Sequence, residues 1–240
     1  MKAQKRLGIV GGLGTETSCD FCLVVNNIIR QKKRCQPDIV MENVAVPLDI
    51  EKSMINGTVE KRMEKLLLRA VSRLNNSGAD FIVIPCNTVH VFIDSLRKNS
   101  RKPILSIIEE TANECVKREA KKVGLLASTT TVKQKLHETE LGKRGIDILL
   151  PRNQKKVSEV ILNILASKAG EKEIQTLLAI IGGLKQDGAD VVILGCTDLQ
   201  SIMNGKESAL PLIDTTAVLI NSAVKELCKP CGLKAWRNKK

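Results

Sequence analysis

Aromatic side chains are scarce in this sequence of 240 residues, which contains three Phe, one Trp and no Tyr. The core must therefore be aliphatic, and a surface that stacks the bases of single-stranded nucleic acid is disfavoured. The sequence also lacks an apolar run of about 18 residues, and its first residues lead into a strand-like pattern without the apolar core of a signal peptide. We therefore expect a cytoplasmic protein with no membrane segment.

Acidic residues are fewer than basic residues, with 26 Asp and Glu compared with 38 Lys and Arg, which gives a formal net charge of +12. Such an excess attracts anions over a long range, whether nucleic acid or a small dicarboxylate. The basic residues are scattered along the chain, which is typical of a solvated surface. We therefore expect no nucleic-acid partner, although the basic stretch 234–240 keeps that alternative open.

A chain of this size without an export signal is expected to keep its eight cysteines as reduced thiols. Two pairs have the Cys-x-x-Cys spacing of zinc ligands, at residues 19–22 and 228–231. The first pair falls within a helical pattern that has no turn between the two thiols, so we expect no metal. Cys35 and Cys115 have no evident sequence partner and are best explained by packing.

The chain is organised around a pattern that occurs twice, at residues 78–90 and 188–199. In each copy, Gly-Ala-Asp leads into an almost wholly apolar run that ends in a cysteine eight residues after the glycine. Such a run predicts a strand buried on both faces, which places Cys86 and Cys196 at the carboxyl ends of parallel strands, where ligands bind. The polar residues that follow predict a helix cap behind each thiol.

A second repeat supports two related lobes, because residues 122–127 have the character of residues 7–10. The first strands are offset by 116 residues and the cysteines by 110. Strands that alternate with helices predict the α/β class with parallel sheets. Besides the cysteine strands, we expect strands at 7–10, 38–46, 103–107, 122–127, 146–150 and 209–213, and a loop over 47–57 that ends at a cap on Thr58. We expect helices between the strands, except over residues 108–121, for which no element is predicted. The chain is expected to finish with a helix capped by Asp214 and Thr215 and a basic tail from Cys228 onward.

The first strand is followed by a glycine loop, residues 11–18. Its bare N–H groups could meet an anionic ligand, or the loop could be a tight turn that needs the conformational freedom of glycine. It is not a dinucleotide-binding fingerprint, because Thr17 stands where the third glycine belongs, and it lacks the Gly-Lys-Ser/Thr ending of a P-loop.

Two cysteines at matched positions suit a reaction that removes a proton from one face of a carbon and returns one to the opposite face. A helix N-terminus favours the thiolate form of one cysteine, while the other stays protonated as the acid. The alternative is that Cys86 and Cys196 are small core residues at strand ends.

The segments at 85–90 and 194–199, together with the opening Gly-Gly-Leu-Gly, resemble the aspartate/glutamate racemase superfamily, and its aspartate racemase branch most closely. The resemblance covers roughly residues 7–227. It implies two Rossmann-like lobes with parallel sheets related by pseudo-twofold symmetry, formed by residues 1–107 plus 215–240 and by residues 108–214. It also implies a site in the cleft between the lobes, a small amino-acid substrate that is a dicarboxylate, no pyridoxal phosphate or metal, and a homodimer.

The resemblance also implies roles for individual residues. Cys86 and Cys196 match the catalytic cysteines. Positions that match the substrate-binding residues of the family are Gly12, Thr15, Asn87, Thr88, Ser128, Thr131, Thr197 and Asp198. Thr15 stands where relatives often have proline, and Asp198 where they often have glutamate, which could shift the size of the substrate. Lys52 and Lys168 are candidates for holding a distal carboxylate, or they are surface lysines.

The two histidines are assigned from their neighbours. His90 follows Cys86 within the expected helix, where a structural role is favoured over a direct one. His137 lies among Lys135, Glu138 and Glu140, so we expect it on the surface.

The leading hypothesis is a cofactor-independent racemase of aspartate or glutamate. The alternatives are another superfamily activity, namely isomerisation of maleate, racemisation of hydantoins or decarboxylation of arylmalonates, and a non-catalytic protein that binds anions or nucleic acid.

Overall fold

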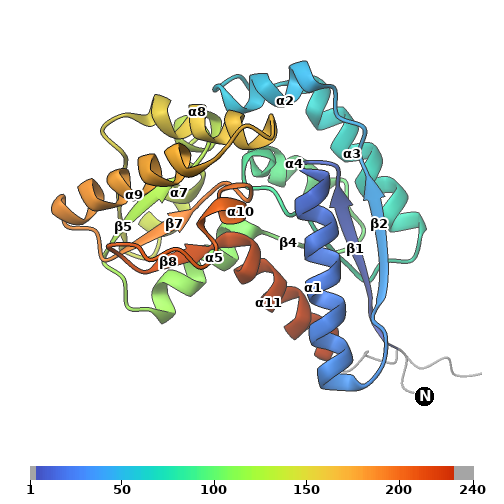
Figure 1. Ribbon diagram of the computed structural model, residues 1–240. Helices are drawn as coiled ribbons and strands as arrows, with labels where there is room; N and C mark the ends of the chain where they lie inside the picture. The colour runs from blue at the N-terminus through green and yellow to red at the C-terminus, as the bar shows by residue number, and fades with distance from the viewer. Residues whose placement is uncertain (1–3, 230–240) are drawn as a thin grey trace, which may run out of the picture.

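A computed structural model describes residues 4–229, and its strands form two four-stranded sheets in which all neighbouring strands are parallel (Figure 1). The order is β2-β1-β3-β4 in the first sheet and β6-β5-β7-β8 in the second, so the two sheets repeat one topology. This confirms the predicted α/β class with two parallel sheets. The strands are β1 (Arg6–Gly11), β2 (Asp38–Asn43), β3 (Phe81–Val83), β4 (Ile104–Leu105), β5 (Lys122–Leu126), β6 (Asp147–Leu149), β7 (Val191–Leu194) and β8 (Leu212–Asp214).

The helices occupy most of the expected stretches, with two exceptions. Residues 47–57 are not a loop, because they contain α2, and the helix α5 was not predicted at all. The helices are α1 (Thr15–Lys33), α2 (Leu48–Ile55), α3 (Lys61–Asn76), the 3-10 helix η1 (Thr88–Phe92), α4 (Ile93–Lys98), α5 (Ile107–Lys117), α6 (Thr129–Lys133), α7 (Leu136–Gly142), α8 (Gln154–Leu165), α9 (Glu171–Gln186), α10 (Leu199–Met203) and α11 (Thr215–Cys228).

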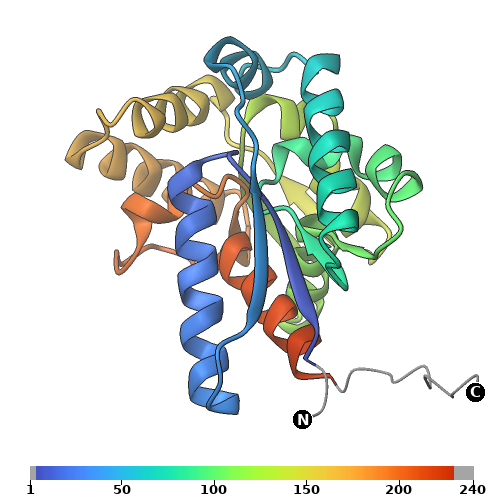
Figure 2. The same ribbon diagram turned by 90° about the vertical axis from the view of Figure 1, so that its right-hand side faces the viewer.

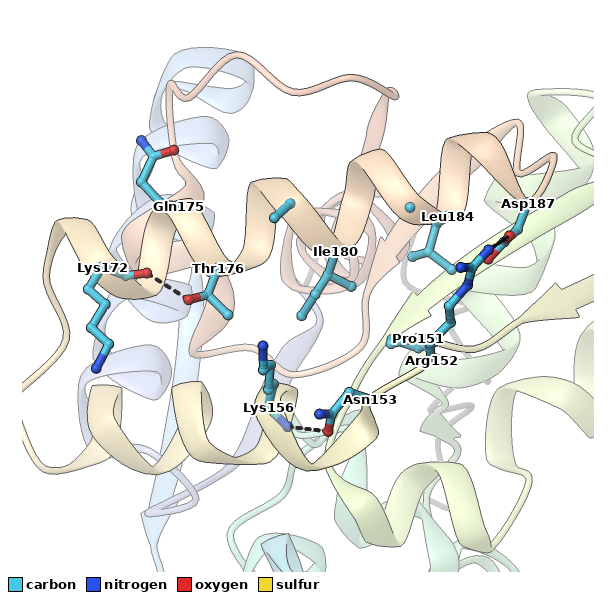
Figure 3. A pocket seen from close by; sticks show the side chains of 12 residues that line it. Pro151, Arg152, Asn153, Lys156, Lys172, Gln175, Thr176, Ile180, Leu184 and Asp187 are labelled. Atoms are coloured by element: carbon cyan, nitrogen blue, oxygen red, sulfur yellow. Dashed lines mark hydrogen bonds and ion pairs between the residues drawn. The ribbon is translucent and has the colours of Figure 1, made fainter.

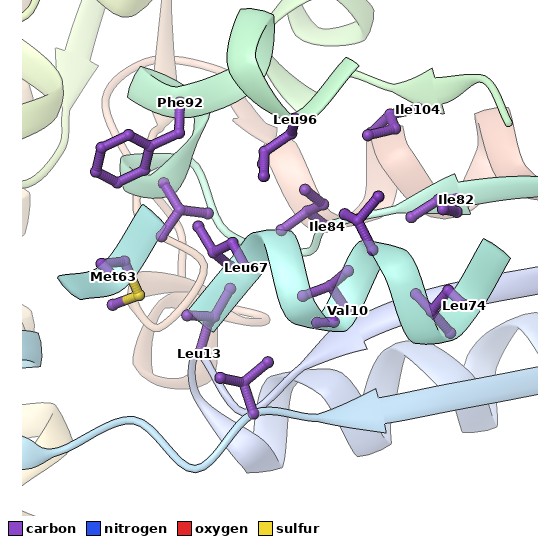
Figure 4. Packing of buried hydrophobic residues seen from close by; sticks show 14 of the residues in the cluster. Val10, Leu13, Met63, Leu67, Leu74, Ile82, Ile84, Phe92, Leu96 and Ile104 are labelled. Atoms are coloured by element: carbon purple, nitrogen blue, oxygen red, sulfur yellow. The ribbon is translucent and has the colours of Figure 1, made fainter. Parts of the chain in front are cut away.

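One face of the first sheet is covered by α3, whose apolar residues recur every three or four positions. Leu67 and Leu74 on this helix belong to the same buried cluster as Val10 of β1 and Ile82 of β3 (Figure 4). All four side chains are at most 1% exposed. This aliphatic packing fixes the strand whose carboxyl end leads to Cys86.

The last helix, α11, follows the second sheet in the chain but packs on the first. It lies alongside α1 (Figures 1 and 2), and its Leu219 and Leu227 share a buried cluster with Leu7 of β1. The Asp214 carboxylate accepts a hydrogen bond from the Thr216 N–H at 2.8 Å, which confirms the predicted cap on Asp214. The division of the chain into two lobes at residues 107 and 214 stays a prediction.

Other predicted helix ends are wrong or only partly confirmed. The N-cap of α3 is Glu60 rather than Thr58. Asn87 and Asp198 stand at the N-cap positions of η1 and α10, but neither side chain accepts a capping hydrogen bond. Cys228 is the last residue of α11 rather than part of a tail, and the rest of the expected basic tail, 230–240, lies outside the described residues.

The short helix α2 connects the two halves of the structure. It contacts α6 of the second half and also α8, which lies next to it in Figure 1, and its Ile55 packs in a cluster with Val157 and Ile161 of α8. Its Met54 packs instead in the core of the first sheet. Helix α2 therefore spans the space between the carboxyl ends of the two sheets. Within residues 4–229, no helix has the length and apolar character needed to cross a membrane.

Candidate active site

The two repeated cysteines line one small cavity. Cys86 follows β3 and Cys196 follows β7, so the first and the second sheet each contribute one thiol. The cavity has a volume of about 50 Å³. Six of the predicted site residues line it: Cys86, Asn87, Thr88, Cys196, Thr197 and Asp198. Its other lining residues are Glu51 and the apolar side chains of Leu13, Val46, Met54, Ile55, Met63, Val89 and Leu165.

The half-buried Cys86 thiol is influenced by backbone donors and by two carboxylates. Loss of solvation raises its pKa to about 12, and the charges of Asp198 and Glu51 add to the increase. The backbone N–H groups of Val89 and Thr88, at the start of η1, act in the opposite direction, because they stabilise the thiolate. At neutral pH this cysteine is therefore a protonated thiol beside donors that favour its ionised form.

The Cys196 thiol is buried beside a carboxylate. Its Sγ donates a hydrogen bond to Asp198 Oδ2 at 3.4 Å. Burial raises the pKa of Cys196 well above its usual value, and the negative charges of Asp198 and of an ionised Cys86 raise it further. The second thiol is therefore also protonated, and a neighbouring acceptor holds its proton.

Asp198 is itself held by a residue that the sequence analysis missed. Thr17 Oγ1 donates a hydrogen bond to Asp198 Oδ1 at 3.4 Å. Burial raises the pKa of Asp198, and Glu16 contributes to the increase, whereas the hydrogen bonds from Cys196 and Thr17 lower it. The predicted loop position Thr15 is exposed and does not line the cavity. The hydroxyl that contacts Asp198 is thus two residues further along α1.

A chain of buried hydrogen bonds connects the two cysteine segments. His137 Nε2–H donates to Asn87 Oδ1 at 3.0 Å, Asn87 Nδ2 donates to Thr215 Oγ1 at 2.9 Å, and Thr215 Oγ1 donates to the carbonyl of Leu194 at 2.9 Å. Leu194 ends β7, two residues before Cys196. Because Asn87 Nδ2 serves as a donor to Thr215, its Oδ1 accepts, which assigns the proton of His137 to Nε2.

The surface position predicted for His137 is wrong. Its side chain is fully buried, and this burial lowers its pKa to about 3. The charged neighbours in the sequence lie on other faces of α7, while His137 shares the buried face with Leu141. The helical spacing of these two residues was the signal that could have identified His137 as buried.

His90 has the structural role that the sequence favoured. Its Nδ1–H donates to the carbonyl of Cys86 at 2.7 Å, and its Nε2 accepts from the Ile107 N–H at 3.3 Å. Burial lowers the pKa of His90 to about 4. The neutral ring therefore connects the turn after Cys86 to the start of α5, outside the cavity lining.

Ser128 and Thr131 support the cavity from behind. Ser128 Oγ lies 2.9 Å from Thr88 Oγ1 and 3.0 Å from Thr131 Oγ1. All three residues are buried, but only Thr88 lines the cavity. Ser128 also caps α6 by accepting from the Thr131 N–H. This cluster of hydroxyl groups fixes Thr88 across the boundary between the first and the second sheet.

Gly12 and the two candidate lysines lie away from the lining. Gly12 has a φ of +81°, and a Cβ there would lie 2.1 Å from the carbonyl oxygen of Val44, so the close approach of these backbones requires glycine. The glycine loop thus has the steric need of a tight turn. Lys52 and Lys168 are both exposed, and neither lines the cavity.

The structure also has a larger cavity, of about 550 Å³, between α8 and α9 (Figure 3). Its walls carry Lys156, Lys172 and Arg152, and the guanidinium of Arg152 pairs with Asp187 at 2.6 Å. None of the predicted site residues contributes to it. Among residues 4–229, no group of three Cys, His, Asp or Glu side chains is placed to hold a metal ion.

The chain is similar to known racemases along most of its length. The model of the family described as Asp/Glu/Hydantoin racemase matches residues 10–223. The broad specificity amino-acid racemase RacX of Bacillus subtilis is 24% identical over 223 residues, which cover 91% of this chain and 96% of RacX. The glutamate racemase of Aquifex pyrophilus is 27% identical over 132 residues, which cover 54% of this chain and 50% of that protein.

Solved structures repeat the fold. The aspartate racemase of Picrophilus torridus superposes with a TM-score of 0.76 at 23% identity and covers 93% of this chain and 94% of its own. The aspartate racemase homologue PH1733 of Pyrococcus horikoshii OT3 gives a TM-score of 0.75 at 22% identity and covers 94% of this chain and all of its own.

Proposed function

Because the chain belongs to the Asp/Glu/hydantoin racemase family, we propose that it racemises an amino acid by proton transfer between the α-carbon and two cysteines, Cys86 and Cys196. The racemases among its relatives support an isomerase. The observation that carries the two-cysteine mechanism is that one thiol from the end of each sheet lines the same cavity.

In the proposed reaction, one cysteine as thiolate removes the α-proton, and the other cysteine as thiol gives a proton to the opposite face of the planar carbanion. The roles exchange in the reverse direction. This step inverts the configuration and balances the protons, because each turnover ionises one thiol and regenerates the other. Since two thiols supply both the base and the acid, we propose that the reaction needs neither pyridoxal phosphate nor a metal.

The carbanion forms beside the α-carboxylate, which must be stabilised as negative charge spreads onto it. The hydroxyl groups of Thr88 and Thr197 and the amide of Asn87 line the cavity as neutral polar groups suited to this task. Thr88 and Asn87 are already fixed by buried hydrogen bonds, so they need not reorient when the charge develops. Asp198, next to Cys196, suits the α-ammonium group.

Both thiols are protonated at neutral pH in the surroundings described above, so one of them has to ionise when the substrate binds. The α-ammonium group brings a positive charge into the cavity and thereby favours a thiolate. The cavity of about 50 Å³ is far smaller than the roughly 300–1,000 Å³ typical of small-molecule sites. We therefore propose that the cleft opens to admit the substrate and closes before the proton transfer.

Further expectations remain proposals. These are the two lobes formed by residues 1–107 plus 215–240 and by residues 108–214, the homodimer and the cytoplasmic location. Aspartate and glutamate, the substrates that the resemblance implies, are candidates among the amino acids of the panel that tests the proposal. The predicted lysine contact to a distal carboxylate has no support in the cavity, because Lys52 and Lys168 do not line it.

Chiral chromatography of a panel of L-amino acids incubated with the protein tests the proposal. We expect the D-enantiomer to accumulate to equal amounts for at least one amino acid, and to be lost in both Cys86→Ser and Cys196→Ser. The exposed cysteine variant Cys35→Ser is the matched control and should racemise at the wild-type rate. Full activity in either active-site variant would reject the two-cysteine mechanism.

A further inference from the structure

The charge of the thiol cavity is opposite in sign to the charge of the whole protein. The chain has a formal net charge of +12. Yet the ionisable lining groups other than the two thiols are both carboxylates, on Glu51 and Asp198, and no Lys, Arg or His between residues 4 and 229 lines the cavity. Exposed Glu16 acts on both carboxylates from α1 and adds to this negative potential.

The two carboxylates differ in how they are engaged. Asp198 accepts hydrogen bonds from Cys196 and Thr17, next to the site of proton transfer. Glu51 comes from α2 on another side of the cavity, is half-buried, and within residues 4–229 receives no hydrogen bond on its carboxylate. Loss of solvation raises the pKa of Glu51, and the negative charge of Asp198 raises it further. Glu51 is thus a desolvated acceptor without a partner among these residues.

Glu51 shares the cavity with apolar side chains. Met54 and Ile55 follow it on α2, and they line the cavity together with Leu165 from the end of α8. A ligand in the cavity therefore meets aliphatic surface as well as the carboxylate of Glu51. A substrate side chain with an apolar stem and a positively charged end matches this combination of surfaces.

A dicarboxylate substrate does not match the charge of this cavity. Aspartate or glutamate carries a net charge of −1 into a cavity that already holds two carboxylates, and like charges in a desolvated site repel strongly. A side-chain cation removes this repulsion. It also adds positive charge near the thiols, which favours the thiolate that the reaction requires.

We infer that this site prefers amino acids whose side chain ends in a cation over those whose side chain ends in a carboxylate. In this inference, Glu51 binds the end of the substrate side chain and selects its charge. The inference rests on the proposed racemase function and refines its substrate class. Asp198 meets the α-ammonium group that all amino acids share, and Glu51 meets the group that differs among them.

The test uses four L-amino acids of similar length: lysine, its uncharged isostere norleucine, glutamate and its uncharged isostere glutamine. The value of kcat/KM for racemisation is measured for each with the full chain. We expect lysine to exceed norleucine by about tenfold, and glutamate to fall below glutamine by about tenfold, which are modest factors for charges in a partly exposed site.

Two variants of Glu51 make the assignment specific. In Glu51→Gln, the ratio of kcat/KM for lysine to that for norleucine should fall toward one, and in Glu51→Lys, glutamate should become a better substrate than lysine. Glu159→Gln removes an exposed carboxylate on α8 that does not line the cavity, and as the matched control it should keep the wild-type ranking. Circular dichroism and urea unfolding check that each variant is folded.

The outcomes separate this inference from the function on which it rests. Racemisation with glutamate or aspartate as the preferred substrate would overturn the inference and leave the two-cysteine mechanism intact. An unchanged lysine-to-norleucine ratio in folded Glu51→Gln would remove Glu51 from its assigned role. If no amino acid is racemised or exchanges its α-proton, the proposed function fails, and the inference fails with it.

Discussion

The surroundings of Cys86 and Cys196 differ although the sequence presents the two residues as copies of one pattern. Both follow the third strand of a sheet with the same strand order. At Cys86 the backbone N–H groups of Val89 and Thr88 favour the thiolate and the charges of Asp198 and Glu51 oppose it, whereas Cys196 donates a hydrogen bond to the side chain of Asp198. The repeat thus fixes the positions of the two thiols, and their neighbours make them unequal.

This difference has a chemical consequence. A group that must act as acid in one direction and as base in the other works best when its proton affinity can change on binding. Backbone N–H groups favour both thiolates, but the side chain of Asp198 is hydrogen-bonded to Cys196 alone, and its charge favours the protonated form of that thiol. We expect Cys86 to ionise first when the substrate binds.

Removing either thiol is expected to cause the largest loss of activity. Cys86→Ser and Cys196→Ser each leave one face of the α-carbon without its acid or base. We expect racemisation to fall by about 100- to 10,000-fold in each variant, which is the usual contribution of a positioned acid or base. Initial rates with both enantiomers measure the loss. A decrease of less than tenfold in either variant would mean that this thiol is not required.

Neutralising Asp198 makes the surroundings of the two thiols more alike. In Asp198→Asn the substrate ammonium loses its counter-charge, and we expect kcat/KM to fall by about ten- to a hundredfold. Because the charge of Asp198 raises the pKa of both thiols, the rise of kcat/KM with pH should also move to lower pH. A pH profile measures the shift, and Asp187→Asn, in the cavity between α8 and α9, is the control. A shift to higher pH would contradict this account.

The neutral network beside Cys86 is tested through His137. In His137→Phe the Oδ1 of Asn87 loses its donor inside the protein, which should lower the free energy of unfolding by about 1–3 kcal/mol. Urea unfolding at pH 7.5 measures the loss. Glu138→Gln, on the exposed face of the same helix, should change it little.

The same network predicts how stability depends on pH. The folded pKa values of His137, about 3, and His90, about 4, lie below the unfolded value of about 6.5. Their contribution is therefore complete above pH 6.5 and is lost as the pH falls toward these folded values, by about 1.4 kcal/mol per pH unit for each histidine. His137→Phe should show a weaker loss between pH 6.5 and 5. An equal loss of unfolding free energy in wild type and variant would mean that the folded protein protonates His137 as readily as the unfolded chain does.

The smallest effect is expected for the lysine that the family resemblance suggested as a substrate contact. Lys168 is exposed and does not line the cavity, so Lys168→Ala should change KM by less than about twofold for any substrate. Steady-state kinetics with lysine and glutamate check this. A large increase of KM for glutamate alone would assign Lys168 to a distal carboxylate after all.

The sequence could predict the strands and the thiols because these depend on local patterns. The apolar runs before Cys86 and Cys196 are typical of strands that are buried on both faces of a parallel sheet. It could not predict that Glu51 lines the cavity together with Asp198, or that Thr17 donates to Asp198, because these residues are far apart in the chain and no local rule relates them.

Some misses had a local signal. Ser106 accepts from the Glu109 N–H, and this Ser-x-x-Glu spacing marks the start of α5. Helix α2 is harder to detect, because it has only eight residues, follows Pro47 and carries several charges. Its stability comes from packing Ile50, Met54 and Ile55 against both halves of the structure, which only the folded chain provides.

Deuterium incorporation by the single-cysteine variants in heavy water tests the central claim most directly. A variant that keeps one thiol can remove a proton and return deuterium only on the face of that thiol. We predict that Cys86→Ser washes deuterium into the α-position of one enantiomer and Cys196→Ser into that of the other, with neither variant forming the opposite enantiomer at an appreciable rate. Exchange of the same enantiomer by both variants would contradict the placement of the two thiols on opposite faces of one carbon.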